Sequence, residues 1–313
     1  MLKKLLFNLL KKKRESFPKL LSIELSSSCN AKCIMCPHPT IMTRTKQNMP
    51  AEILDKILAD CKGKPLKKVN LFWFGDSLCN KHVIDHFRLI RSSLPGVKLY
   101  LSTNAELLSS DKAEAILDEG LLDVINFDID GVKEETHFNI RKVKLETVIE
   151  NILYFLDYQK TSKKGAKIQT RATIIEMTEN VDEVPAFKEY WTGKVDKVDV
   201  NKYNTWLGDI EDRNVDKGGS APLSSGFTFA CQHPWDELVI SSKGEGGLCC
   251  LDYDLKAPLG NVMESSVEEI WKNDTMKDYR NKMLQGQYDQ IEVCKNCNAH
   301  IFQYKSTWAK LQS

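Results

Sequence analysis

The sequence has few of the features that mark membrane, secreted or nucleic-acid-binding proteins. No apolar run approaches the ~20 residues that a membrane-spanning helix requires. The longest uncharged stretch near the start, Leu5–Leu10, contains Asn8 and is not followed by a small-residue cleavage site, so no signal peptide is expected. The net charge is only +1, which gives no reason to expect nucleic acid as a partner.

Cysteine is also too sparse for a disulfide scaffold. The 313 residues include 10 cysteines, a density far below that of small secreted domains held by disulfides. Hydrophobic residues make up 42% and charged residues 28% of the chain, which is typical of a soluble globular protein with one large domain or a medium and a small one. With unpaired cysteines and no export signal, we expect a cytoplasmic location.

Residues 1–19 form a separate segment in the sequence. Leucines recur at the spacing of one helix face, and lysines and an arginine supply the charge around it. We predict a basic amphipathic helix here. Such a helix can make peripheral contact with an anionic membrane surface, but its single apolar stripe favours docking on the rest of the protein or on a partner.

Three cysteines lie close together after this segment. Cys29, Cys33 and Cys36 form the pattern C-x₃-C-x₂-C, with no fourth cysteine nearby. Three thiolates on one loop can hold three corners of a cubane iron–sulfur cluster and leave the fourth iron open. An open iron can bind and activate a substrate, whereas a fully ligated cluster mainly transfers electrons. A zinc site completed by His38 is the alternative that the spacing leaves open.

Short β-rich runs alternate with helical runs over residues 20–203. The predicted strands are Leu20–Leu25, Val69–Phe74, Val97–Ser102, Val124–Asp130, Lys167–Ile175 and Val195–Tyr203. The predicted helices are Ala51–Cys61, His82–Ser92, Asp111–Glu119, Leu145–Tyr158 and Val184–Trp191. This order predicts an α/β fold with a parallel sheet curled into a partial, TIM-like (β/α)₆ barrel. Ligands collect at the carboxyl ends of such strands, and the three cysteines follow the first one.

A second group of cysteines follows a change in composition. Residues 204–230 are acidic and then rich in Gly, Ser and Pro, which indicates a linker. We expect residues 231–313 to form a small α+β domain that ends in a helix. Four thiolates from this region can enclose a second cluster, and the candidates are Cys231, Cys294, Cys297 and one of the adjacent Cys249 and Cys250. Zinc bound by four cysteines is the alternative.

Together these features resemble the radical S-adenosylmethionine (radical SAM) superfamily, in which the open iron of a 4Fe–4S cluster chelates S-adenosylmethionine. The C-terminal region is similar to the auxiliary-cluster domain called SPASM, or twitch in its shortened form. The matching residues are Cys231, Trp235, Gly244, Cys249, Cys294 and Cys297. Because no cysteine follows Cys297, the resemblance implies the twitch form, with a single auxiliary 4Fe–4S cluster.

The resemblance also implies which residues contact the cofactor. Met35 matches a residue that packs near the adenine. The turn Gly75-Asp76-Ser77 stands where the family usually carries a Gly-Gly-Glu-Pro-like motif, which holds the amino group of the cofactor. The complete implied set is Met35, Gly75, Asp76, Ser77, Ser102, Asn104, Asp128 and Arg171.

The adjacent cysteines have different implied roles. The spacing from Gly244 makes Cys249 the ligand of the auxiliary cluster, which leaves Cys250 as a free thiol beside it. Some sugar epimerases of the superfamily use such a thiol as a hydrogen donor to the substrate radical, and Cys250 is the candidate for that role here. The alternative is that Cys250 is a small buried residue without a chemical role.

The resemblance implies an oxidoreductase that abstracts hydrogen from a small polar substrate, such as a sugar or an aminocyclitol, with dehydrogenation or epimerisation as the result. An external electron donor such as flavodoxin or ferredoxin is implied as a partner. A peptide-modifying enzyme is the second possibility, although those proteins commonly carry an additional recognition domain. A non-catalytic electron carrier is the third, and the open coordination site in the first motif argues against it.

Overall fold

The computed structural model describes residues 16–215 and 231–297. One sheet runs through it in the order β6-β5-β4-β3-β2-β1-β7-β8-β9. Its first six strands pair in parallel, as the sequence predicts. They are β1 (Leu20–Ile23), β2 (Lys68–Asn70), β3 (Lys98–Thr103), β4 (Val124–Asp128), β5 (Gln169–Glu176) and β6 (Lys197–Lys202).

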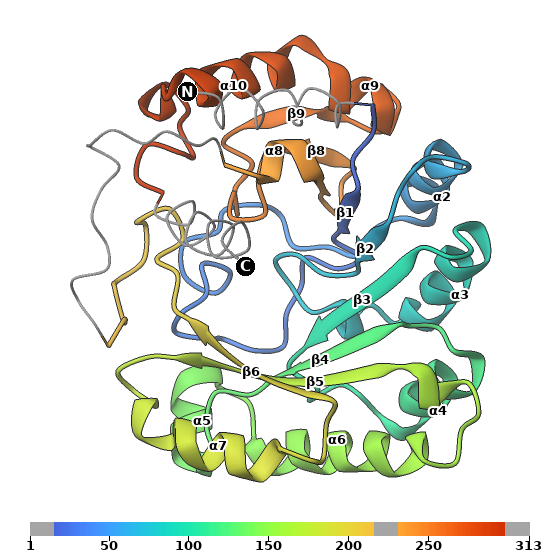
Figure 1. Cartoon of the computed structure of the whole chain (residues 1–313), viewed down its shortest axis with the longest axis vertical. Coiled ribbons are helices and arrows are strands. Elements are labelled where there is room, and N and C mark those ends of the chain that lie inside the picture. The colour runs from blue at the N-terminus through green and yellow to red at the C-terminus, as the bar shows by residue number, and fades with distance from the viewer. Residues whose placement is uncertain (1–15, 216–230, 298–313) are drawn as a thin grey trace, which may run out of the picture.

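Helices cover the outer side of this curved sheet, as Figure 1 shows. They are α2 (Ala51–Cys61), α3 (Val83–Ser93), α4 (Ser110–Glu119), α5 (Glu134–Arg141), α6 (Leu145–Gln159) and α7 (Val184–Trp191). Every second residue of a strand packs against these helices and is part of the apolar core. In β3, Leu99 and Leu101 are fully buried, whereas Tyr100 and Ser102 on the other face are half-buried. The inner face of the barrel is therefore polar.

The C-terminal region extends the same sheet. Strand β7 (Glu237–Ile240) pairs in parallel with β1, and β8 (Glu245–Gly247) and β9 (Pro258–Asn261) follow in antiparallel order. Helices α8 (His233–Asp236), α9 (Val267–Lys272) and α10 (Asp274–Gln285) pack around these strands. The sequence predicts a linker between the barrel and the C-terminal region. In the structure the two regions share one sheet and one continuous apolar core.

The predicted partial barrel is confirmed, with two differences. Helix α5 is absent from the prediction because its buried face lacks the repeating apolar residues that indicate a helix. The buried residues are His137, Ile140 and Arg141, and only Ile140 is aliphatic. Strand β2 ends at Asn70 instead of continuing to Phe74, because the chain turns there into the cavity described below.

Several predicted segments lie outside the described residues. These are most of the N-terminal helix, most of the linker and the C-terminal helix, which fall in residues 1–15, 216–230 and 298–313. None of the helices in the described ranges has the length and apolar character needed to cross a bilayer.

Candidate active site

The three cysteines of the C-x₃-C-x₂-C pattern line one cavity at the carboxyl ends of the barrel strands. Cys29, Cys33 and Cys36 lie on the loop that follows β1, and the cavity has a volume of about 220 Å³. The C-terminal end of α5 holds this loop, because the backbone N–H groups of Lys32 and Ile34 donate to carbonyl oxygens of that helix at 3.0 and 2.9 Å. The shape of the loop therefore depends on a helix that is distant in sequence.

The spacing of the thiols distinguishes a cluster from a single metal ion. Ligand atoms on one tetrahedral zinc ion lie roughly 3.8 Å apart, given Zn–S bonds of about 2.3 Å. Among the described residues, only His233, Cys249 and Cys250 bring three ligand atoms within 4.8 Å of one another. The thiols of the loop cysteines do not all lie within this limit of one another, so the loop as it stands is too open for a single zinc ion. His38 lines the same cavity, but its Nε2 lies 2.8 Å from the carbonyl oxygen of Ser27.

Burial makes the loop thiols weak acids. It raises the pKa of Cys36 to about 12, and it also raises the pKa values of Cys29 and Cys33. The guanidinium of Arg141 opposes this shift at Cys33, where its Nη1 lies 3.9 Å from Sγ. Because coordinated metal deprotonates a thiol outright, iron binding at this loop displaces protons from the three cysteines.

The turn after β2 requires glycine at its first position. Gly75 has a φ of 138°, and a Cβ there would stand 2.3 Å from the carbonyl oxygen of Ser26. Only glycine allows the two backbone segments to approach this closely. Ser77 in the same turn is fully buried and does not line the cavity; its Oγ donates to the carbonyl oxygen of Leu71 at 2.5 Å.

Asp76 fastens this turn to the end of β3. One carboxylate oxygen accepts from the N–H of Leu78 at 2.9 Å. The other accepts from Thr103 Oγ1 at 2.7 Å and from both the backbone N–H and the Nδ2 of Asn104 at 3.0 and 2.9 Å. Burial raises the pKa of Asp76, and these hydrogen bonds oppose the shift. Asp76 thus holds the Asn104 side chain at the cavity that both residues line.

A second carboxylate lies at the inner face of the barrel. Asp128 accepts from Ser102 Oγ at 2.7 Å through one oxygen and from Asn126 Nδ2 at 2.7 Å through the other. Burial raises the pKa of Asp128 to about 6. Ser102 and Asp128 line the cavity, so this carboxylate offers hydrogen-bond acceptors to a hydroxyl or amino group in it.

Arg171 lies elsewhere. Its Nη2 forms an ion pair with Asp199 at 2.8 Å, between the neighbouring strands β5 and β6. It does not line the cavity that contains the cysteines. The predicted contact of Arg171 with the cofactor therefore has no support from the geometry, because the pairing within the sheet already uses its guanidinium.

Sequence reasoning missed several residues that line the cavity, including an arginine and three aromatic residues. Arg141 lies on the unpredicted helix α5, so its sequence context gave no signal. The sequence predicts Trp73 and Phe74 as part of a strand and Trp206 as part of the linker, whereas all three line the cavity. The signal for Trp206 was an aromatic residue within a segment otherwise poor in apolar residues.

A larger cavity adjoins the first one. It has a volume of about 480 Å³ and lies at the carboxyl ends of β5 and β6. The two cavities share Met35, Ile175 and Trp206 as lining residues. Met35, the residue predicted to pack near adenine, thus lies at the boundary between the two cavities.

The second cysteine group lines a separate cavity in the C-terminal region. Its lining includes Cys231, Cys249, Cys294 and Cys297 together with apolar residues from α10 and the following turn. Burial raises the pKa values of Cys231 and Cys294. The structure thus collects the four predicted thiols from three distant segments. The four thiols do not all lie within 4.8 Å of one another, whereas Cys249 is within that limit of Cys250 and His233.

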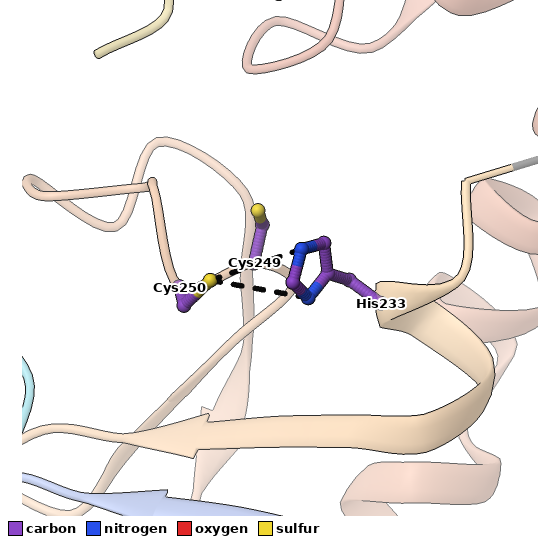
Figure 2. A group of neighbouring side chains, drawn as sticks. All are labelled: His233, Cys249 and Cys250. Carbon is purple, nitrogen blue, oxygen red and sulfur yellow. Dashed lines mark hydrogen bonds between the residues drawn. The ribbon is translucent and has the colours of Figure 1, made fainter. Parts of the chain in front are cut away.

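Cys250 does not line this cavity or the one that contains the first cysteine group. Figure 2 shows its Sγ in contact with the His233 ring, 3.9 Å from both ring nitrogens. The Cys249 Sγ lies within 4.8 Å of the Cys250 Sγ and of a His233 ring nitrogen. His233 Nδ1 lies 2.9 Å from a carboxylate oxygen of Glu237. The two adjacent cysteines therefore differ in that only Cys249 lines the cavity, while the ligand atoms of both lie within 4.8 Å of His233. Their predicted roles stay a prediction.

Comparison with known proteins agrees with this arrangement. The sequence profile of the radical SAM superfamily matches residues 23–178, and that of the iron–sulfur cluster-binding SPASM domain matches residues 231–298. The chain belongs to the radical SAM superfamily. As a radical SAM enzyme it uses a 4Fe–4S cluster together with S-adenosylmethionine, and its SPASM domain binds an auxiliary iron–sulfur cluster.

Individual relatives of this radical SAM enzyme are distant. S-adenosyl-L-methionine-dependent 2-deoxy-scyllo-inosamine dehydrogenase from Niallia circulans is 19% identical over 89% of this chain and 92% of its own length. GTP 3′,8-cyclase from Campylobacter fetus is 30% identical, but over only 42% of this chain and 41% of its own.

Two solved structures show the fold at low identity. BtrN in complex with AdoMet and 2-DOIA has a TM-score of 0.62 and 15% identity, covering 90% of this chain and 93% of its own. Streptococcus suis SuiB bound to the precursor peptide SuiA has a TM-score of 0.69 and 16% identity, covering 86% of this chain and 68% of its own.

Proposed function

We propose that this radical SAM enzyme oxidises or epimerises a small polar substrate of the sugar or aminocyclitol class. Cys29, Cys33 and Cys36 hold the cluster that binds S-adenosylmethionine. When bound, this pair supplies a carbon radical that abstracts hydrogen from an unactivated carbon. The chain itself has to bind and orient the substrate carbon and keep water away from it.

The lining of the cavity that contains these cysteines carries the proposal. Its wall is aromatic, with Trp73, Phe74 and Trp206, and its inner face offers the polar groups of Asn104 and Asp128. A polyhydroxylated ring presents apolar C–H faces and polar edges, which match these two kinds of surface. With a pKa of about 6, Asp128 is ionised at neutral pH, so it accepts hydrogen bonds from hydroxyl or ammonium groups.

The auxiliary site supports an oxidative outcome. We assign Cys231, Cys249, Cys294 and Cys297 as the ligands of its cluster, because these four thiols line one cavity. A cluster enclosed by four thiolates transfers single electrons. The cluster that these four cysteines would hold could accept the single electron that must leave the substrate, together with one hydrogen atom from the carbinol carbon and the hydroxyl proton, for a carbonyl to form.

The relatives support the same substrate class. The dehydrogenase from Niallia circulans is similar to this chain over nearly its whole length, and its name gives an aminocyclitol as the substrate. SuiB, the second solved structure, is bound to a precursor peptide, and this chain covers only 68% of it. A peptide substrate is therefore the second candidate.

Anaerobic reconstitution tests the proposal. Sugars and aminocyclitols deuterated at single carbons are expected to transfer deuterium into 5′-deoxyadenosine and to yield a ketone or an epimer. The measurement is mass spectrometry of both products. Transfer from a peptide and from none of the ring compounds would contradict the proposed substrate class, and the absence of any 5′-deoxyadenosine would contradict the enzyme assignment itself.

The Cys250→Ala variant separates the two outcomes in this assay. If the Cys250 thiol returns hydrogen to the substrate radical, epimerisation is expected to stop while deuterium transfer to 5′-deoxyadenosine continues. If the enzyme is a dehydrogenase, ketone formation is expected to stay near the wild-type rate, because the thiol faces His233 and lines neither cavity. Unchanged epimerisation in this variant would end the hydrogen-donor hypothesis.

We also propose a reduced external donor, flavodoxin or ferredoxin, and a reducing compartment such as the cytoplasm. Both follow from the chemistry of the cysteines. None of the ten forms a disulfide in the structure, and clusters of this kind need a single-electron donor for each reductive cleavage.

A further inference from the structure

Two tryptophans that line the active cavity make the same contact with different cluster loops. Trp73 Nε1 donates to the carbonyl oxygen of Cys250 at 2.7 Å, next to the auxiliary ligand Cys249. Trp206 Nε1 donates to the carbonyl oxygen of Met35 at 2.6 Å, next to Cys36. Each indole thus bonds the backbone one residue from a proposed cluster ligand, and each bond joins segments that are far apart in sequence.

Phe74 connects the two indoles into one wall. Its ring centroid lies 5.2 Å from that of Trp73 and 5.2 Å from that of Trp206, in tilted contacts. Phe74 is buried, and all three rings line the cavity. Aromatic contacts at these distances are attractive and restrict the orientation of each ring. We call Trp73, Phe74 and Trp206 the aromatic wall.

A buried ion pair fixes the Trp73 end of the wall. The Arg44 guanidinium lies 4.6 Å from the Trp73 ring centroid. Its two terminal nitrogens bond the Glu24 carboxylate at 2.9 and 2.8 Å, and its Nε donates to the carbonyl oxygen of Tyr253 at 2.6 Å. Glu24 is fully buried and also accepts from the backbone N–H of Phe74 at 3.2 Å. Trp73 is therefore held by both the barrel and the C-terminal region.

Backbone conformation fixes the Trp206 end. Trp206 has a φ of 50°, in the left-handed region that a bulky residue rarely adopts. The Asn204 side chain accepts the Trp206 N–H at 2.7 Å and supports this conformation. Backbone strain of this kind persists only where the surrounding residues impose it. The surrounding structure therefore fixes the Trp206 indole beside the Met35 carbonyl.

We propose that Trp73 and Trp206 are a matched pair of positioning residues, each of which orders one cluster loop while the wall between them holds the substrate. The proposal rests on the ligand sets given under the proposed function. Hydrogen bonding and orientation around a cluster set its reduction potential and signal. Each indole N–H orients a peptide carbonyl beside one cluster only. The effects of the two residues should therefore be separable.

The test replaces each tryptophan with phenylalanine, which keeps a ring in the wall and removes the N–H. In Trp73→Phe, the midpoint potential and EPR signal of the auxiliary cluster are expected to shift. Product formed per 5′-deoxyadenosine is expected to fall about tenfold, while 5′-deoxyadenosine formation itself continues. In Trp206→Phe, the change in EPR signal on adding S-adenosylmethionine and the rate of 5′-deoxyadenosine formation are expected to fall by a similar factor, with the auxiliary signal unchanged.

Two controls keep this test decisive. Trp191→Phe removes a buried indole that lines neither cavity, and both clusters are expected to keep their wild-type signals. Trp73→His restores a ring N–H, so it is expected to recover part of the auxiliary signal if Trp73→Phe loses it.

Other results would overturn the pairing. If both phenylalanine variants disturb both clusters equally, the wall has only a structural role. If neither variant changes a signal, the hydrogen bonds do not influence the clusters. Failure of Trp73→His to recover any signal lost in Trp73→Phe would show that the N–H is not responsible. A wild-type protein that binds no iron would contradict the ligand sets and this inference with them. A protein that keeps both clusters and shows the expected variant effects, but acts on none of the ring compounds, would contradict only the proposed substrate class.

Discussion

Cys33→Ala is expected to abolish cleavage of S-adenosylmethionine. Cys33 is the most buried of the three loop cysteines, and Arg141 is the cation beside it. Loss of one of only three thiolates leaves two irons without a protein ligand, so the cubane is not retained. Mutation of residues that surround a metal ligand typically lowers metal affinity or activity by about 10–100-fold. We therefore expect loss of a ligand itself to reduce 5′-deoxyadenosine formation by more than about 100-fold. The measurement is an anaerobic assay with iron and sulfide analysis of the same sample.

Cys61→Ala is the matched control for this result. Cys61 is also buried, but it lies on α2 and lines neither of the cysteine cavities. Its replacement is expected to leave iron content and cleavage unchanged. The auxiliary cluster should survive in Cys33→Ala, so roughly half of the iron should remain if both clusters are cubanes. Wild-type cleavage by Cys33→Ala, or zinc in place of iron in the wild type, would contradict the cluster assignment.

Arg141→Met is expected to cause the largest loss of stability. Arg141 Nε lies 2.7 Å from a carboxylate oxygen of Asp130, and both side chains are almost wholly buried. Removing the cation leaves Asp130 buried without its partner, which typically costs about 3–5 kcal/mol of unfolding free energy. The same change removes the cation beside Cys33. Denaturant unfolding of the anaerobic holoprotein measures this loss.

The loss should depend on pH in a defined direction. Burial already raises the pKa of Asp130, and Arg141 opposes that shift. Without Arg141, the folded-state pKa rises further above the unfolded value. A carboxyl with a raised folded-state pKa favours folding at low pH, and this contribution is lost as the pH rises through the folded-state value. We therefore expect Arg141→Met to be less destabilised at pH 6 than at pH 8.5.

Two further variants test the cause. Asp130→Asn combined with Arg141→Met removes the unpaired charge, so it is expected to recover part of the stability and to flatten the pH dependence. Arg88→Met breaks ion pairs with Asp85 and Glu119 that are largely exposed, and it is expected to change the free energy of unfolding far less than Arg141→Met does. Equal losses in Arg88→Met and Arg141→Met would show that burial of the Arg141 pair has no special importance.

The sequence by itself determined the chemistry and the frame. The spacing of Cys29, Cys33 and Cys36 is local, and it follows directly from the ligand number of a cubane with one open iron. The order of the barrel strands also follows from local patterns, because β-rich and helical runs have different periods and parallel crossovers have one hand. These features placed the cysteines at the carboxyl end of β1 without any tertiary information.

Only the tertiary structure decided which other residues meet the cysteines. Arg141 reaches Cys33 from a short helix whose buried face has no apolar period, and Trp73 and Trp206 bond backbone groups of segments distant in sequence. Likewise, only the tertiary structure shows that Cys249 lines the cavity of the second cysteine group, whereas Cys250 contacts His233 without lining that cavity. Local periodicity contains no information on such contacts, because they depend on how distant segments pack. The contact of Trp73 with Cys250, for example, joins the two regions that the pairing of β1 with β7 brings together.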